Sequence, residues 1–216
     1  MRIAVVLVVV LGLVTPLAAQ TRRTATRDEP AVSFRGFFLA SGEQLAAGKT
    51  FDAVLGAQSM RPFWGGGAQV NFRRGLFAEI AVSRFSSTGA RAFVVDGQVI
   101  PVGIPLTLAL TPIEVTGGYR FQVSRRVVPY AAAGVGRYQY TETSSFSESS
   151  ENIDASYAGF VVQGGVEIRL HPWIGAGVDA QYTRVGGVLG VAGISKEFGE
   201  DDLGGAALRV KILVGR

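Results

Sequence analysis

Apolar residues recur at every second position over segments of about ten residues along most of the chain. Near the C-terminus, Val210 and Ile212 share one side of such a segment, whereas Arg209 and Lys211 share the other. Successive side chains of a β-strand point to opposite faces, so this alternation predicts strands with one apolar and one polar face. The pattern marks eight segments: 32–40, 68–72, 76–83, 113–121, 129–141, 156–169, 173–183 and 208–214.

The links between these segments differ in length in a regular way. Short turns are expected at 73–75, 122–126 and 170–172, and longer links at 41–61, 86–105, 143–154 and 185–203. An up-and-down meander places its short turns at one end, and outer-membrane barrels have short periplasmic turns and long external loops. The sequence therefore predicts an all-β fold, a closed antiparallel up-and-down transmembrane β-barrel of about eight strands. Residues 93–100 resemble a hairpin around Asp96-Gly97 that projects from the rim.

The first residues have the form of a secretory signal. Met1-Arg2 precede an apolar run at 3–14, and small residues follow before Gln20. A run of this length is too short for a membrane-spanning helix and is typical of a signal peptide. We expect a cleaved signal peptide at 1–19, an N-terminal periplasmic segment at 20–30 and the outer-membrane barrel at 31–216.

Composition narrows the class of protein further. Mean hydropathy is +0.29, yet no later apolar stretch has the length of a spanning helix. The chain has no cysteine, which excludes a disulfide framework and thiolate metal sites. The net charge of +4 is not gathered into a basic stripe, so no nucleic-acid partner is expected. The 29 glycines suit the sharp curvature of a small barrel.

Glycine- and aromatic-bearing strands give the chain a family resemblance. These are Phe63–Gly67, Pro129–Gly136 and the closing strand Gly205–Val214, downstream of the predicted signal peptide. The chain resembles the small eight-stranded outer-membrane barrels, of the OmpA-type transmembrane barrel and the OmpW-like family. The resemblance implies a monomer in the cell outer membrane, surrounded by its lipid and inserted by the barrel-assembly machinery. The chain departs from the family pattern in ending on Val214-Gly215-Arg216 rather than on an aromatic residue, and in having no peptidoglycan-binding domain.

The polar faces of the strands carry charges of both signs. If the apolar faces meet lipid, these charges fill a lumen that eight strands make just wide enough for side chains. A lone buried charge is costly, so the charges must pair, and we expect a plug of salt bridges rather than an open pore. The predicted lumen charge network consists of Arg35, Glu79, Glu114, Arg120, Arg137, Glu167, Arg169, Asp179, Arg209 and Lys211, joined by Gln69, Asn71, Gln139 and Gln181.

Aromatic residues near the predicted strand ends are candidates for the girdles at the two membrane interfaces. The alternative is an ordinary aromatic core. The candidates are Phe38, Phe63, Trp64, Phe85, Tyr138, Tyr140, Trp173 and Tyr182.

Patterns that suggest chemistry have simpler structural explanations. The Gly-rich stretch 175–180 matches a loose dinucleotide-binding pattern, but a strand continues where a helix should begin. The single histidine, His171, lies in a short turn before Pro172. An acidic run in the last long link could offer oxygen ligands to a divalent cation, but its spacing fits no defined loop. That run contains Glu197, Glu200, Asp201 and Asp202. We therefore expect no enzyme, no cofactor and no metal.

Three functions fit these observations. The first is an outer-membrane barrel with a structural or surface-interaction role, which needs only the fold and its loops. The second is a narrow channel for ions or small solutes, which needs a continuous polar path. The third is a soluble lipocalin-like carrier, whose cavity would be apolar and whose outer face would be charged.

Overall fold

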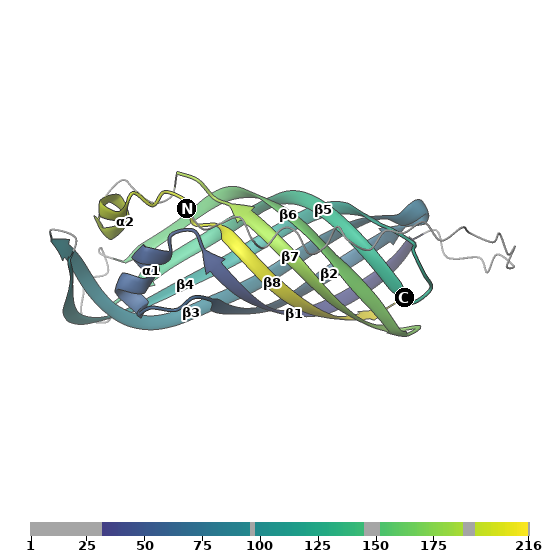
Figure 1. Cartoon of the computed structure of the whole chain (residues 1–216), viewed down its shortest axis with the longest axis horizontal. Coiled ribbons are helices and arrows are strands. Elements are labelled where there is room, and N and C mark those ends of the chain that lie inside the picture. Colours follow the sequence, from purple (N-terminus) through teal and green to yellow (C-terminus); the bar gives the residue numbers. More distant parts are fainter. Residues whose placement is uncertain (1–31, 96–97, 145–151, 188–192, 216) are drawn as a thin grey trace, which may run out of the picture.

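The chain folds into a closed barrel of antiparallel strands (Figure 1). The computed structural model describes residues 32–95, 98–144, 152–187 and 193–215. The strands are β1 (Val32–Leu45), β2 (Arg61–Phe72), β3 (Leu76–Val95), β4 (Gln98–Arg120), β5 (Val127–Thr143), β6 (Ile153–His171), β7 (Ile174–Arg184) and β8 (Gly205–Gly215). Each strand pairs with the next in the chain, and β8 pairs with β1. The predicted fold class is confirmed, and each of the eight predicted segments overlaps a different strand.

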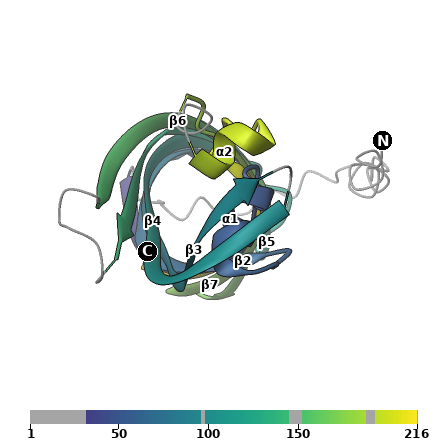
Figure 2. The same cartoon turned by 90° about the vertical axis from the view of Figure 1, so that its left-hand side faces the viewer.

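The links gather at the two ends of the barrel as the sequence predicts. One end has the short turns, including the single helical turn Arg73–Gly75, and also the C-terminal end of β8. The other end has the long links, which contain the helices α1 (Gly48–Leu55) and α2 (Gly193–Phe198). Figure 2 looks onto this second end and shows α1 within the outline of the barrel and α2 at its rim. Following the arrangement of outer-membrane barrels, whose short turns are periplasmic, we call the end with the short turns the periplasmic end and the end with α1 and α2 the external end.

Several strands are longer at the external end than the sequence predicts. β1 continues to Leu45, and the expected link at 86–105 is instead a hairpin formed by β3 and β4, with Val95 opposite Gln98. The predicted turn of the hairpin, Asp96-Gly97, lies outside the described residues, and the strands on either side of it are paired. The signal peptide and segment predicted within 1–30, and residues 145–151 of the link at 143–154, lie outside the described residues. In the described part of the chain, no helix has the length and apolar character to cross a membrane.

The outer surface of the barrel is apolar over most of its length. Every strand contributes exposed, outward-facing apolar side chains, and together we call them the apolar belt. The belt consists of Phe34, Phe38, Trp64, Phe72, Leu76, Ile80, Val82, Val115, Tyr119, Val127, Val135, Phe160, Val162, Val166, Ile168, Ile174, Val178, Tyr182, Leu208, Val210, Ile212 and Val214. Water would be a poor solvent for such a surface, whereas the hydrocarbon of a bilayer suits it. The soluble carrier, which needs the opposite arrangement of faces, is therefore wrong.

The predicted aromatic girdle is wrong for half of its candidates. Phe38, Trp64, Trp173 and Tyr182 are exposed on the outside of the barrel. The other four candidates, Phe63, Phe85, Tyr138 and Tyr140, are buried inside it. They belong to strand segments near the external end, where the interior is apolar.

Close contact between strands depends on glycine at particular positions. A Cβ atom on Gly67 of β2 would lie 2.0 Å from the carbonyl oxygen of Ile80 and 2.6 Å from Cζ of Phe37. The absence of a side chain at Gly67 leaves room for the Phe37 ring beside β2 inside the narrow barrel. Phe37 and Leu39 then pack with Ala81 and Leu213 on the inner face.

Candidate functional site

The interior of the barrel begins, at its periplasmic end, with a carboxylate held by two arginines. Glu167 of β6 is 2% exposed and accepts hydrogen bonds from Nη1 of Arg35 at 2.7 and 2.8 Å. Nη2 of Arg120 donates to Oε2 of Glu167 at 2.5 Å, and its Nη1 donates to Oδ1 of Asn71 at 2.8 Å. β1, β2, β4 and β6 thus meet across the lumen at this level. A carboxylate buried this deeply is stabilised only because cations contact both of its oxygens.

The middle of the lumen contains a second group of ion pairs. Lys211 of β8 lies 2.6 Å from Oε1 of Glu79 and 3.5 Å from Oδ2 of Asp179. Asp179 also accepts a 2.5 Å hydrogen bond from Nε of Arg209 and a 2.6 Å bond from the hydroxyl of Tyr130. Each of these charges is at most 3% exposed. The group ties β3, β5, β7 and β8 together through side chains, in addition to the backbone ladder.

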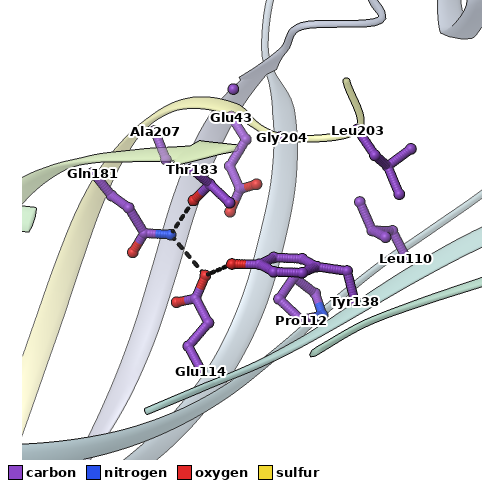
Figure 3. A pocket seen from close by; sticks show the side chains of 11 residues that line it. Glu43, Leu110, Pro112, Glu114, Tyr138, Gln181, Thr183, Leu203, Gly204 and Ala207 are labelled. Atoms are coloured by element: carbon purple, nitrogen blue, oxygen red, sulfur yellow. Dashed lines mark hydrogen bonds between the residues drawn. The ribbon is translucent and has the colours of Figure 1, made fainter. Parts of the chain in front are cut away.

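Above this group, Glu114 of β4 is the outermost carboxylate of the network. The hydroxyl of Tyr138 and Nε2 of Gln181 both donate to its Oε1, at 2.8 and 2.9 Å. Nη1 of Arg209 lies 3.6 Å from Oε2 of Glu114. Figure 3 shows the side chains of Glu114, Tyr138 and Gln181 around a small pocket, which Glu43, Leu110 and Leu203 also line. The pocket marks the boundary between the charged part of the lumen and an apolar part above it.

The charges of the paired network balance. Four cations, Arg35, Arg120, Arg209 and Lys211, are bridged to four carboxylates, Glu79, Glu114, Glu167 and Asp179. Gln163 lies between them: its Nε2 approaches Oε1 of Glu79 at 3.4 Å, and its Oε1 accepts a hydrogen bond from Arg209. The polar part of the lumen thus contains a balanced set of charges, in which each charge contacts at least one charge of opposite sign.

The external end of the lumen is filled by apolar side chains. This apolar plug consists of Leu45, Ala47, Phe51, Phe63, Phe85, Leu108, Leu110, Tyr138, Tyr140, Val185 and Leu203. Phe51 comes from α1, so the link between β1 and β2 folds back into the barrel mouth. The rings of Phe63 and Phe85 pack with centroids 5.3 Å apart. The guanidinium of Arg61 lies 5.6 Å from the Phe51 ring and is bridged to Asp52 at 2.9 Å.

The acidic run of the last long link holds this plug in place. Oε2 of Glu200 accepts 2.8 and 2.7 Å hydrogen bonds from the backbone N–H and the hydroxyl of Thr50, and its Oε1 accepts from the N–H of Lys49 at 3.1 Å. A helix leaves its first N–H groups unpaired, so a carboxylate at this position stabilises α1. Asp202 accepts from the N–H of Val185 at 2.8 Å. Among the described residues, no group of three His, Asp or Glu side chains is arranged to hold a metal ion.

Of the ten charges predicted for the lumen, eight form the paired network. Arg169 shares the inner face of β6 with Glu167 at the periplasmic end, is partly exposed, and forms no ion pair with a described residue. Arg137 was assigned wrongly, because it is exposed on the outer face of β5, as is Gln139. The residues at alternate positions of β5 that share a face with Arg137, namely Ala131, Ala133 and Val135, are apolar and could have revealed this. The alternation of faces holds along the whole strand, but the polarity of each face does not.

Sequence reasoning missed two features of the interior. Tyr130 and Tyr138 donate hydrogen bonds to lumen carboxylates. Both are at even-numbered positions of β5, which face lipid if Arg137 faces the lumen as predicted. The helix α1 was expected to be part of an external link, and nothing in its short sequence indicates that Phe51 fills the barrel mouth. Its burial depends on residues distant in the chain, such as Leu203 and Tyr140.

Comparison with known proteins identifies the class to which this fold belongs. The family described as the outer membrane protein beta-barrel domain matches residues 5–211, and the chain belongs to this family. A comparison with curated protein sequences finds no match. The protein is accordingly an integral protein of the cell outer membrane, with lipid around its apolar belt.

Solved structures of small outer-membrane barrels resemble most of this chain. Neisserial surface protein A is similar with a TM-score of 0.54 and 12% sequence identity, over 85% of this chain and 96% of that chain. The N-terminal β-barrel domain of Pseudomonas aeruginosa OprF is similar with a TM-score of 0.44 and 12% identity, over 83% of this chain and 96% of that chain. At such identity, the first of these likenesses shows a shared fold and nothing about shared ligands.

Proposed function

We propose that this protein is a closed barrel that acts as a structural component of the outer membrane and presents its external loops to the surroundings, without transport and without catalysis. One observation carries the proposal: two groups of side chains, one charged and one apolar, fill successive parts of the lumen. The paired charges fill its periplasmic and middle parts, and the apolar plug with Phe51 fills its mouth. An ion crossing the barrel would have to break buried ion pairs and then enter an apolar region, and both steps are costly.

Conductance in a planar bilayer tests whether the barrel is closed. We expect the wild-type protein to show no steady conductance. Arg209→Glu serves as the leaky reference, because it places a fifth carboxylate beside Glu114 and Asp179 and so unpairs the network. Large, long-lived openings of the wild-type protein would contradict the closed barrel and favour the narrow channel.

Labelling of whole cells tests whether the loops face outward. The chain has no cysteine, so a single introduced thiol reports one position. Glu197 is exposed in α2 at the end with the long links, and Ser124 is exposed in the turn between β4 and β5. A membrane-impermeant maleimide should label Glu197→Cys but not Ser124→Cys on intact cells, and both after lysis. The reverse pattern would contradict the assigned orientation.

We also propose that the barrel is inserted by the barrel-assembly machinery and is a monomer, and the apolar belt supports the monomer. All eight strands present lipid-facing apolar side chains, so no sector of the barrel stands out as an interface with a second copy. Light scattering in detergent should give the mass of one chain plus its micelle. A defined dimer would contradict this part of the proposal.

A further inference from the structure

Three arginines lie on the outside of the barrel toward its external end. Arg84 is on β3, Arg137 on β5 and Arg184 on β7, and each is exposed on the outward face of its strand. The side chain of Arg184 is 62% exposed. These residues are separate from the lumen, and the proposed closed-barrel role makes no use of them.

The strand register determines the level of each residue along the barrel axis, because paired residues on successive strands are not at the same level. A row of paired residues that starts at Gly36 on β1 passes through Ala68, Ile80 and the following strands, and returns to β1 beside Ala46. Positions 36 and 46 are ten residues apart on β1. Each step from one strand to the next along a row therefore rises toward the external end by slightly more than one residue.

This rise places the three arginines at the same level. Gln139 lies two strands from Arg84 along one row and is two residues farther out than Arg137 on the same strand. Along the row, Gln139 is about two residues closer to the external end than Arg84. Arg137 is two residues closer to the periplasmic end than Gln139, so Arg84 and Arg137 are at nearly the same level along the barrel axis. The same relation holds between Arg137 and Arg184. The three lie within about one residue's rise, ~3 Å along the barrel axis.

The outward face changes polarity at this level. Two positions closer to the periplasm on the same strands and faces are Val82, Val135 and Tyr182, which belong to the apolar belt. Two positions farther out on β3 and β5 are Ser86 and Gln139, both polar and exposed. The arginines therefore lie at the boundary between the hydrocarbon and the headgroups of the outer leaflet. Trp64, opposite Arg84 on β2, is an exposed aromatic of the kind that occupies this interface.

Most of the hydrogen-bonding capacity of the arginines is directed away from the protein. The side chain of Arg84 forms no hydrogen bond or ion pair with another described residue, and the side chain of Arg137 donates only from Nε, to Ser156. Arg184 is 4.0 Å from Oδ2 of Asp202, at the long limit of an ion pair. The guanidinium groups thus have free donors at the depth where lipid headgroups lie.

We propose that Arg84, Arg137 and Arg184 bind the phosphate groups of lipids in the outer leaflet. A guanidinium forms paired, charge-assisted hydrogen bonds with phosphate oxygens and suits this anion better than an ammonium does. The arginines are on alternate strands, so neighbours are about 10 Å apart around the barrel and each contacts a different phosphate. A phosphorylated lipid with its chains against the apolar belt would bring its headgroup to this level.

Protection of the folded barrel by lipid tests the proposal. The purified protein is titrated in detergent with diphosphoryl lipid A, and the melting temperature is followed by gel migration. The variant Arg84→Gln/Arg137→Gln/Arg184→Gln should need about tenfold more lipid for the same protection, because three exposed charged contacts are lost. The matched control loses the same number of charges at the periplasmic end: Arg73→Gln, Arg125→Gln and Arg126→Gln. It should respond like the wild type.

Further arms identify the source of the phosphate. Chemically dephosphorylated lipid with the same acyl chains, and inorganic phosphate alone, should each give much less protection. Equal protection by either of them, or an unchanged response of the triple variant, would overturn the proposal. If the triple variant does not fold, each single variant and the wild type at increasing salt replace it. The phosphorylated lipid should then lose its advantage as salt rises, and an advantage that resists salt would overturn the proposal.

Discussion

Arg137 shows that a polar residue of a strand can face the inside or the outside of the barrel, depending on the solvent around it. Arg137 and Tyr138 are neighbours on β5, yet the charged side chain is outside and the aromatic one is buried inside. Closer to the periplasm on the same strand, Val135 faces outward. Within the membrane the outside is hydrocarbon and the inside is polar, whereas beyond it the outside is water and the inside becomes an apolar core. The change occurs within a few residues along one strand.

Lys211 illustrates the energetic weight of a single lumen charge. Replacing Lys211 by Met should destabilise the barrel by about 3–5 kcal/mol, because Glu79 loses its close cation while it remains buried. Glu79→Gln combined with Lys211→Met should cost less than the sum of the two single changes. Equilibrium unfolding in lipid vesicles measures all four proteins of this cycle. Strictly additive costs would mean that the 2.6 Å contact contributes no coupling energy.

Val210, the residue before Lys211, can be used to test which face of β8 contacts lipid. It is exposed on the outside of β8 within the apolar belt. Val210→Arg should destabilise the barrel by about 2–4 kcal/mol if the residue is near the bilayer midplane, since the charge must enter hydrocarbon. Gln139→Arg, on the outward face beyond the belt, is the matched control and should change stability little. Unfolding in vesicles that shows equal costs for both would place the membrane boundary elsewhere.

At the external end, backbone pairing between β3 and β4 extends these strands beyond the segments that the apolar alternation predicts. β3 and β4 remain paired as far as Val95 and Gln98, although the apolar alternation that marked them is lost near Ser86. The backbone ladder extends the strands without help from an apolar face, and α1 packs beside them. A Cβ atom on Gly89 of β3 would lie 2.0 Å from the carbonyl oxygen of Val54, so α1 lies directly against the strand.

The position of α1 depends on Glu200, and this dependence can be measured. Glu200→Ala removes the acceptor for the N–H groups of Lys49 and Thr50. Backbone amides within α1 should then exchange hydrogen about fivefold or more faster, while those of the barrel strands keep their rates. Glu197→Ala, an exposed change in α2, is the control and should have no effect on α1. Unchanged exchange in Glu200→Ala would mean that packing of Phe51 alone holds the helix.

At the scale of the whole molecule, closure is the decisive property. Pairing of β8 with β1 leaves no free strand edge along the membrane, where an unpaired backbone group would be costly. The ion pairs link strands that are not neighbours, such as β1 with β6 and β3 with β8. The barrel is therefore braced across its interior as well as around its wall.

Glycines at close strand contacts provide a test of closure. A Cβ atom on Gly134 of β5 would lie 2.0 Å from the carbonyl oxygen of Val115, whereas one on Gly117 of β4 would be no closer than 3.9 Å to any other atom. The folded wild-type barrel should migrate differently on a gel before and after boiling. Gly134→Ala should lose the folded band at a lower temperature, because the β4–β5 backbone must shift. Gly117→Ala should behave like the wild type, and equal behaviour of the two variants would contradict this account.

The amino-acid sequence by itself determined the membrane-embedded part of this protein. Alternation with a period of two, short turns at one end and charges of both signs were enough to predict eight strands and the outward faces of all but β5, and to name as lumen candidates the residues that form the paired network, including Glu79 and Lys211. These features are local, because one solvent meets each face throughout that region. Only the tertiary structure decided the external end: that Arg137 faces out, that Phe51 fills the mouth, and that three distant arginines share one level. Those facts depend on where the membrane ends and on the stagger of the strands, and neither is encoded in any single segment.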